Sequence, residues 1–101
     1  MFDLIDTKYE VSYTSRFKKQ LKKKIKQGKD IKKLEFVVSC LANGEVLEPK
    51  YRDHMLIDNK YFSNCRECHI EPDWLLIYKY MNNGLVLVLF ETGSHSEILD
   101  M

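Results

Sequence analysis

The stretch WLLIYKYMNNGLVLVLFE (74–91) contains two strand-like runs joined by a turn signal. Its first run, residues 74–80, is dense in the aromatic and aliphatic residues that β-strands favour. Asn83-Gly84 follows, a dipeptide strongly preferred in the tight turns of β-hairpins. The second run, residues 85–91, is apolar almost throughout, which predicts a central strand covered on both faces. We therefore expect a β-hairpin at the centre of a sheet.

Shorter elements are predicted on both sides of this hairpin. YEVSY (9–13) alternates apolar and polar residues as a strand does, and HMLI (54–57) and RECHI (66–70) are further short candidates. Pro49 marks an irregular connector before them. TGSHSEILDM (92–101) leaves the sheet and is expected to form one helical turn. The sheet should therefore contain four to five strands, mostly antiparallel.

Two amphipathic helices are predicted between the first strand and the connector. Thr14 or Ser15 is a good N-cap for the first helix, and Gly28 ends it. Asp30 caps the second helix and Asn43-Gly44 closes it. The apolar stripe of the first helix consists of Phe17, Leu21 and Ile25, and that of the second of Ile31, Leu34, Val37, Val38 and Leu41. The order of elements predicts one α+β domain over residues 1–101, with the helices packed on one face of the sheet.

The composition limits the class of protein. Hydrophobic residues make up 45% of the 101 residues, which excludes a disordered chain. No apolar run approaches the roughly 20 residues of a membrane span. The N-terminus MFDLIDTKYE (1–10) lacks the basic and apolar regions of a signal peptide, so we expect a cytoplasmic protein without membrane contacts. Three cysteines, an odd number, fit reduced thiols better than disulfides.

Positive charge is concentrated in residues 16–33, although the formal net charge is only +1. Ten basic residues in this run face a single acid, Asp30. Such segregation indicates either a surface for a polyanion, most simply nucleic acid, or a solvated helix face. If the surface binds nucleic acid, we expect the RNA contacts to include Lys22, Lys23 and Lys26.

Cys65, Cys68 and His69 form a C-x-x-C-H run, the pattern of covalent haem attachment and part of many zinc sites. Haem attachment usually needs export, for which there is no signal. Zinc sites commonly use two separated ligand pairs, and two cysteines three apart on a strand point to opposite faces. We therefore predict that the run binds neither haem nor zinc, and that the protein needs no cofactor or metal.

The three histidines, His54, His69 and His95, all fall near strand ends in the C-terminal half. Asp73 follows His69 by four residues. A lone surface histidine is ordinary, but three near strand ends that a hairpin sheet can bring together suggest acid–base chemistry, because imidazole can give and take protons near neutral pH.

These residues also carry a family resemblance. YRDHML (51–56), CHIEPDWLLIYK (68–79) and ETGSH (91–95), preceded by two basic helices, resemble the YafQ branch of the RelE/ParE superfamily of bacterial type II toxins. The resemblance extends from about Tyr9 to Leu99. It implies a RelE-like toxin that cuts mRNA in the ribosomal A site without a metal. It also implies a cognate antitoxin of the DinJ/RelB type that wraps the toxin and blocks it.

Carried over by motif, the catalytic cluster is His54, His69, Asp73 and His95, with Trp74 as a neighbouring aromatic that is either an RNA contact or a core anchor. RNA is cut when its 2′-hydroxyl is deprotonated and attacks the adjacent phosphorus. We expect His54 to be the general base and His95 the general acid, although the two roles can be exchanged. His69 is expected to hold the phosphate, and Asp73 to orient a histidine.

The chain departs from the family pattern at two positions. Glu91 stands where the family usually has an arginine that stabilises the transition state, and Leu99 stands where the family has an aromatic residue. Arg52 or Arg66 is expected to supply the missing positive charge and to contact RNA. The alternatives are a weak or non-catalytic RelE-fold protein that acts through antitoxin or RNA binding, and a ParE-like gyrase inhibitor, which needs no histidine cluster.

Overall fold

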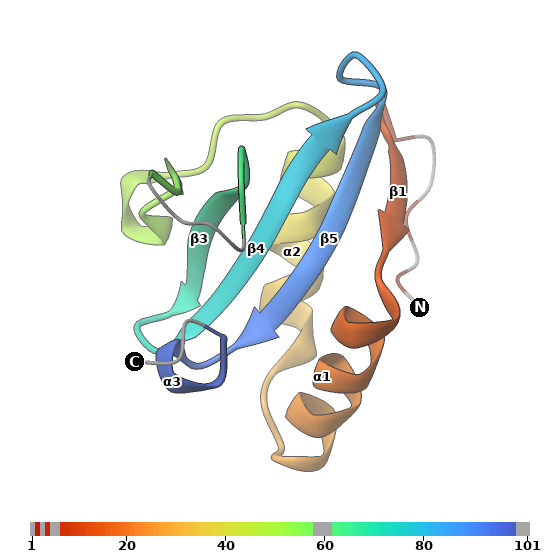
Figure 1. Cartoon of the computed structure of the whole chain (residues 1–101). Helices are drawn as coiled ribbons and strands as arrows, with labels where there is room; N and C mark the ends of the chain where they lie inside the picture. Colours follow the sequence, from red (N-terminus) through yellow and green to blue (C-terminus); the bar gives the residue numbers. More distant parts are fainter. Residues whose placement is uncertain (1, 3, 5–6, 58–61, 99–101) are drawn as a thin grey trace.

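Five strands form one mixed sheet in the order β1-β5-β4-β3-β2 (Figure 1). The computed structural model describes residues 2, 4, 7–57 and 62–98. The strands are β1 (Glu10–Tyr13), β2 (His54–Met55), β3 (Arg66–Glu71), β4 (Trp74–Met81) and β5 (Val86–Gly93). β1 pairs in parallel with β5, and the other neighbours are antiparallel. The predicted α+β class and mostly antiparallel sheet are confirmed.

The central hairpin joins β4 to β5 through a turn in which Asn82, Asn83 and Gly84 all have positive φ, at 54°, 57° and 80°. Asparagine and glycine enter this left-handed region most readily, which explains the sequence of the turn. The prediction that the second strand is covered on both faces is wrong. Leu87 and Leu89 are buried against the helices, whereas the alternate residues of β5 before Glu91 are only half-buried. β4 carries the continuous buried run instead, from Trp74 to Tyr78.

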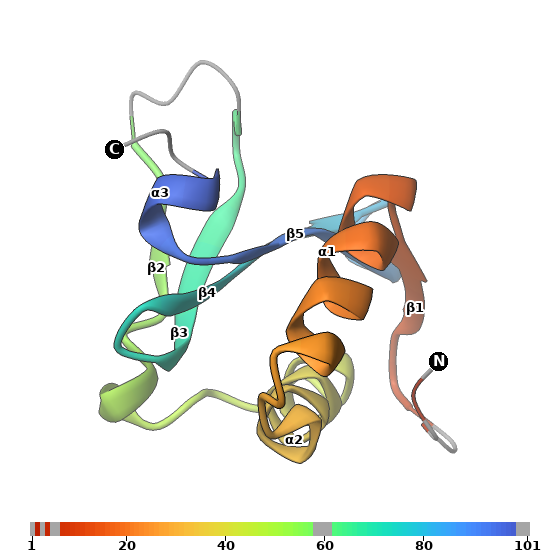
Figure 2. The same cartoon turned by 90° about the horizontal axis from the view of Figure 1, so that it is seen from below.

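Two helices, α1 (Ser15–Lys26) and α2 (Ile31–Ala42), cover one face of the sheet (Figure 2). Thr14 caps α1, since its side chain accepts a hydrogen bond from the Phe17 amide, and Asp30 caps α2 in the same way. Both predicted N-caps are confirmed. One predicted core residue is wrong: Ile25 is 54% exposed, and the aliphatic stem of Lys24 fills the next buried position after Leu21. Lys24 can be buried because a carboxylate from the other end of the chain meets its ammonium group.

The opposite face of the sheet holds a smaller hydrophobic cluster under α3 (His95–Ile98), which is the predicted C-terminal helical turn. Figure 2 shows α3 on the other side of the sheet from α2. Cys65 belongs to this smaller cluster, whereas Cys68 lies in the main core beneath the helices. The predicted opposed directions of the two thiols are confirmed.

The connector after α2 contains a short 3-10 helix, η1 (Pro49–Tyr51), which ends at Arg52 in a left-handed conformation with φ at 49°. This reversal brings the chain into β2 at the sheet edge, beside β3. None of the helices in the described part of the chain is long and apolar enough to cross a membrane.

Candidate active site

The three histidines come from three different elements and lie in one row. His54 begins β2, His69 lies near the end of β3, and His95 begins α3. The ring centres of His54 and His69 are 6.5 Å apart, and those of His69 and His95 are 5.5 Å apart. All three are at least partly accessible to solvent. The fold therefore brings the histidines together on the sheet face opposite α1 and α2.

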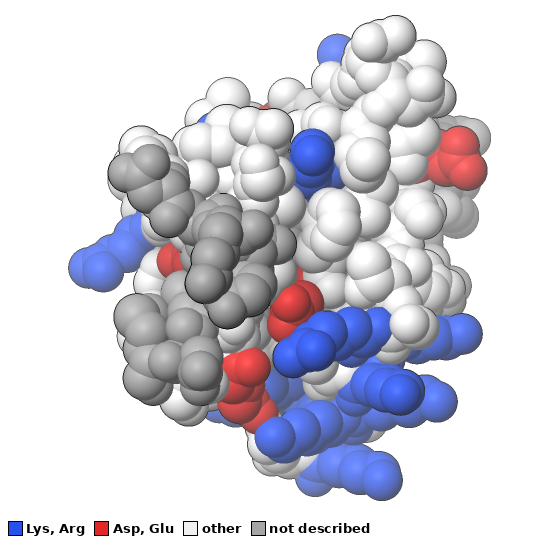
Figure 3. Space-filling model, viewed as in Figure 1, with Lys and Arg blue, Asp and Glu red and all other residues white. Residues whose placement is uncertain are grey.

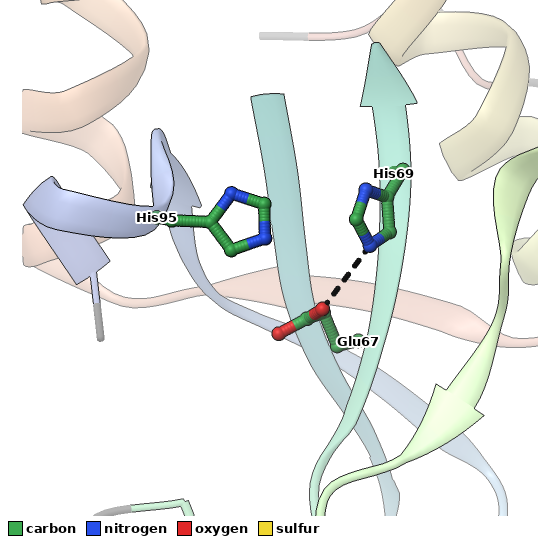
Figure 4. A group of neighbouring side chains, drawn as sticks. All are labelled: Glu67, His69 and His95. Carbon is green, nitrogen blue, oxygen red and sulfur yellow. Dashed lines mark ion pairs between the residues drawn. The ribbon is translucent and has the colours of Figure 1, made fainter. Parts of the chain in front are cut away.

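Glu67 lies among the histidines (Figure 4), and the sequence analysis did not identify it. It is buried, with 4% of the residue exposed. Its Oε1 is 3.3 Å from Nε2 of His69 and 3.7 Å from Nε2 of His54. Its Oε2 is buried without a hydrogen-bond partner among the described residues. Strand alternation is the sequence signal that could have identified Glu67. Residues two apart on β3 share a face, so Glu67 lies on the same face as His69.

Backbone carbonyls fix which nitrogen of each ring carries the proton in neutral His54 and His69. Nδ1 of His54 lies 2.7 Å from the carbonyl oxygen of Arg52, and Nδ1 of His69 lies 3.3 Å from that of Pro72. A carbonyl only accepts hydrogen bonds, so each Nδ1 carries hydrogen and each Nε2 faces Glu67. The Nε2 atoms are thus the ones available for proton transfer beside a buried carboxylate.

Asp73 holds His95 through two hydrogen bonds. Its Oδ1 accepts from the backbone N–H of His95 at 3.0 Å and pairs with the ring Nδ1 at 2.7 Å. The backbone bond, followed by the ring bond, lowers the pKa of Asp73 below its usual value. The second bond directs Nε2 of His95 toward Glu67 and His69 (Figure 4).

Glu97 fastens α3, and with it His95, to the basic helix α1. Its carboxylate forms ion pairs with Lys23 and Lys24 and accepts from the backbone N–H of Ser94 at 2.8 Å. These partners, Lys23 first, hold the pKa of Glu97 well below its usual range. Lys23, which was expected to bind RNA, thus pairs with Glu97 while its side chain stays 58% exposed, and its contact with RNA stays a prediction.

Other basic residues of the run are also paired. Arg16 bonds Glu91, and Lys29 and Lys33 bond Glu71. The remaining basic residues of the run are exposed and make no ion pair within the described part of the chain: Lys18, Lys19, Lys22, Lys26 and Lys32. Blue side chains gather over α1 at the lower edge of the molecule (Figure 3). Lys22 and Lys26 are therefore free to meet phosphates.

Two predicted RNA contacts are wrong. Trp74 is 0% exposed and donates its indole N–H to the hydroxyl of Thr92 at 2.9 Å, so it is the core anchor that the sequence left as an alternative. Arg66 pairs across the sheet with Tyr78, on the helix-covered face, and bonds Asp53 and the Tyr78 hydroxyl. It therefore points away from His69 and does not replace the family arginine. Arg52 is exposed beside the site, and Leu99 lies outside the described residues.

The carboxylate of Glu91 bonds two side chains of α1. Its Oε1 accepts hydrogen bonds from Arg16 and Gln20, both at 3.0 Å, and 9% of the residue is exposed. The guanidinium of Arg16 neutralises its charge and is itself largely exposed. The position where the family has an arginine therefore carries an acid–arginine pair.

Glu67, His69 and His95 could also hold a metal ion, because one ligand atom from each lies within 4.8 Å of the others. Two imidazoles and a carboxylate suit divalent transition metals such as copper or zinc. The cysteines do not join them. Burial raises the pKa of both thiols, most strongly for Cys68, which disfavours the thiolate that a metal needs.

Comparison with known proteins identifies the family. The family model described as the bacterial toxin of type II toxin-antitoxin systems, YafQ, matches residues 9–100. The chain belongs to the YafQ toxin family. The mRNA interferase toxin YafQ of Escherichia coli strain B / BL21-DE3 is 35% identical over 88% of this YafQ-family chain and 94% of that relative.

Solved structures of the family have the same fold. A metal-bound toxin from Helicobacter pylori is 40% identical, with a TM-score of 0.81 over 89% of this chain and 98% of that one. YafQ in the E. coli DinJ-YafQ complex is 33% identical, with a TM-score of 0.79 over 89% and 97%. The predicted membership in the YafQ branch is confirmed.

Proposed function

We propose that this YafQ-family toxin is an endoribonuclease that cuts mRNA in the ribosomal A site. The observation that carries the proposal is the row of three imidazoles around the buried Glu67, with Nε2 of His54 and His69 facing its carboxylate. Two relatives that are 34–35% identical are named mRNA interferases, which supports the same reaction.

The reaction requires one group to take a proton and another to give one. Nε2 of His54 removes the proton of the 2′-hydroxyl, which attacks the adjacent phosphorus. Nε2 of protonated His95, held by Asp73, gives a proton to the departing 5′-oxygen. The bond between phosphorus and that oxygen breaks, leaving a 2′,3′-cyclic phosphate and a 5′-hydroxyl. DNA lacks the 2′-hydroxyl and is not cut.

Glu67 supplies the charge balance of this site. Its carboxylate lies 3.3 Å from Nε2 of His69 and pairs with the imidazolium form of that ring, a cation that stabilises the charge that builds up on the phosphorane. Protonated His69 between Glu67 and the phosphate replaces part of the positive charge that the family arginine provides. Arg52, exposed near His69, adds to it.

A cognate antitoxin is the expected partner, since the relative in the solved complex is bound to DinJ. The YafQ-family toxin is expected to need the ribosome to present single-stranded mRNA. Catalysis is expected to proceed without metal, because an ion held by Glu67, His69 and His95 would occupy the imidazole that serves as the general acid.

Cleavage of a defined mRNA in a translation extract tests the proposal. Wild-type protein should leave 5′-hydroxyl ends in the A-site codon, and His95→Ala should lose about a hundredfold or more of the rate, the usual contribution of one acid or base. His95→Ala should still bind the antitoxin, which serves as the folding control. A parent protein that binds antitoxin but does not cut mRNA would establish the non-catalytic alternative, which Glu91 favours.

A further inference from the structure

A groove of about 660 Å³ opens beside the candidate active site and shares only His69 and Arg52 with the chemistry proposed above. It lies between the start of α2, η1 and the end of β3, with His69 on its rim. Figure 2 shows α2 on one side and η1, below the β3–β4 turn, on the other. The volume falls in the range of about 300–1,000 Å³ that binds small ligands. Cationic and aromatic side chains dominate the lining, namely Lys32, Lys33, Phe36, Lys50, Tyr51 and Arg52.

Three cations of the groove are available to a ligand. Lys32, Lys50 and Arg52 are exposed, and none makes an ion pair with any other residue that the structure describes. They approach the groove from two sides, α2 and η1. A row of unpaired cations along a groove suits a chain of phosphates.

The two acids of the groove are already engaged. Glu71 bonds Lys29 at 3.2 Å and Lys33 at 3.0 Å, and its pKa is lowered, chiefly by Lys33. Asp30 accepts the backbone N–H of Lys32 as the N-cap of α2. Four cations line the groove against these two acids, so its net charge is positive.

The groove also offers a platform for stacking. Phe36 is 55% exposed on α2, so its ring is accessible to a ligand. Its ring centre lies 6.5 Å from that of Tyr51, and the Lys50 ammonium lies 5.2 Å from the Tyr51 ring. Exposed aromatic rings among cations are the combination that binds single-stranded RNA, because bases stack on the rings while phosphates meet the charges.

We propose that this groove holds the mRNA nucleotide on the 5′ side of the cleaved bond, with its base stacked on Phe36. The orientation rests on the proposed function, in which His54 activates the 2′-hydroxyl, because that hydroxyl belongs to the 5′ nucleotide. Arg52 of the groove lies two residues before His54 and supplies the carbonyl that orients it. His95, the acid on the 3′ side, does not line the groove. The groove thus holds the base that precedes the cut.

Binding of a short RNA that cannot be cut tests the assignment apart from catalysis. The probe is a single-stranded oligoribonucleotide with a 2′-O-methyl group at the attacking position. It carries the cut site mapped in the translation extract, or a mixed sequence if no cut is found. Fluorescence anisotropy should show that Phe36→Ala raises the Kd about five- to a hundredfold, the usual effect of losing one stacked base. Phe36→Trp should bind as wild type does, and Leu85→Ala, which removes a similarly exposed side chain from the distant hairpin, should have no effect.

An abasic probe gives the position. With the 5′ base removed, wild type and Phe36→Ala should bind equally, whereas removal of the 3′ base should leave their difference intact. If wild type and Phe36→Ala have equal Kd values on the intact probe and wild type cuts mRNA normally, the assignment of the groove is overturned and the nuclease proposal stands. If the Kd depends on Phe36 but wild type cuts no mRNA, the groove stands as an RNA-binding site and the nuclease proposal fails. If Phe36→Ala weakens antitoxin binding and leaves the RNA Kd unchanged, the groove docks protein and the proposal fails.

Discussion

Glu67 is buried and charged, and one of its oxygens has no hydrogen-bond partner among the described residues. Such a group costs folding free energy, so its presence between His54 and His69 indicates a role other than stability. Neighbouring Cys68 and Ile70, by contrast, fill the main core as a strand pattern predicts. The histidines could be found in the sequence because three stand near strand ends, whereas Glu67 could be found only through strand alternation, which places it on the same face as His69.

Replacing Glu67 by Gln should separate function from stability. The variant keeps the shape and removes the charge that pairs with protonated His69, so we expect cleavage to fall by about ten- to a hundredfold. The free energy of unfolding should not fall by more than about 0.5 kcal/mol, because a buried carboxylate, whose Oε2 has no hydrogen-bond partner among the described residues, is replaced by a neutral amide. Cleavage assays and urea unfolding measure the two effects. Glu10→Gln, on the exposed first strand, is the control, and a large loss of stability in Glu67→Gln would contradict this role.

Glu91 needs a charge-swap experiment because Arg16 already bonds it. Glu91→Arg alone places two guanidinium groups together at a buried position, and we expect a loss of about 1–3 kcal/mol in the free energy of unfolding. Arg16→Glu combined with Glu91→Arg should recover most of that stability. The double variant should also cut mRNA faster than wild type, since it has an arginine where the family has one. A restored fold with unchanged cleavage would show that this position does not contribute charge to the reaction.

At the scale of elements, the lysines of α1 fall into two groups that its sequence does not distinguish. Lys23 and Lys24 hold α3 through Glu97, whereas Lys22 and Lys26 make no ion pair with any residue that the structure describes. Sequence identified the helix, its N-cap and its charge, all of which depend on local residues. It could not assign the paired lysines, because their partner lies more than seventy residues away along the chain.

The link between α1 and α3 should depend on pH. The pKa of Glu97 is lowered in the folded protein, so its stabilising effect is complete above the unfolded value near 4.3 and is lost as pH falls toward the folded value. Glu97→Gln should therefore lower the free energy of unfolding by about 1–2 kcal/mol at pH 7. The difference from wild type should shrink steadily below pH 4 or so. Urea unfolding over this pH range checks the prediction, and a difference that stays constant down to pH 2 or so would contradict it.

The free lysines of α1 should act through ribosomal RNA. Replacing Lys22 and Lys26 by Gln removes two cations that meet phosphates, and each phosphate contact contributes about 0.7–0.9 to the slope of log affinity against log salt. Ribosome binding at low salt should therefore weaken, and the slope should fall by about one to two. Lys8→Gln, on the N-terminal side of β1 with its ammonium over Tyr9, is the matched control. A slope equal to that of wild type would show that α1 presents only a solvated face.

At the scale of the whole molecule, the fold could be predicted largely from the sequence because its elements carry local signals, such as Asn83-Gly84 at the central turn and Asp30 at the start of α2. The burial of Trp74 and the direction of Arg66 could not, since both depend on which face of the assembled sheet each strand residue occupies. The three histidines meet only when β2, β3 and α3 are folded together. Any ligand held by residues from more than one of these elements therefore binds only the folded state of the chain.

Added metal should consequently stabilise the fold and stop the reaction. Glu67, His69 and His95 have the spacing of ligands, and imidazole-rich sites bind Cu²⁺ more tightly than other first-row divalent ions. Because the unfolded chain lacks the site, one equivalent of Cu²⁺ should raise the Tm, and it should inhibit mRNA cleavage by occupying His95, the proposed general acid. EDTA should leave cleavage by the purified protein unchanged. Cys65→Ala together with Cys68→Ala should keep the metal response, whereas His69→Ala should abolish it. Copper binding that depends on the cysteines would contradict this metal site. Cleavage that EDTA stops would show that the histidine row does not work by proton transfer alone.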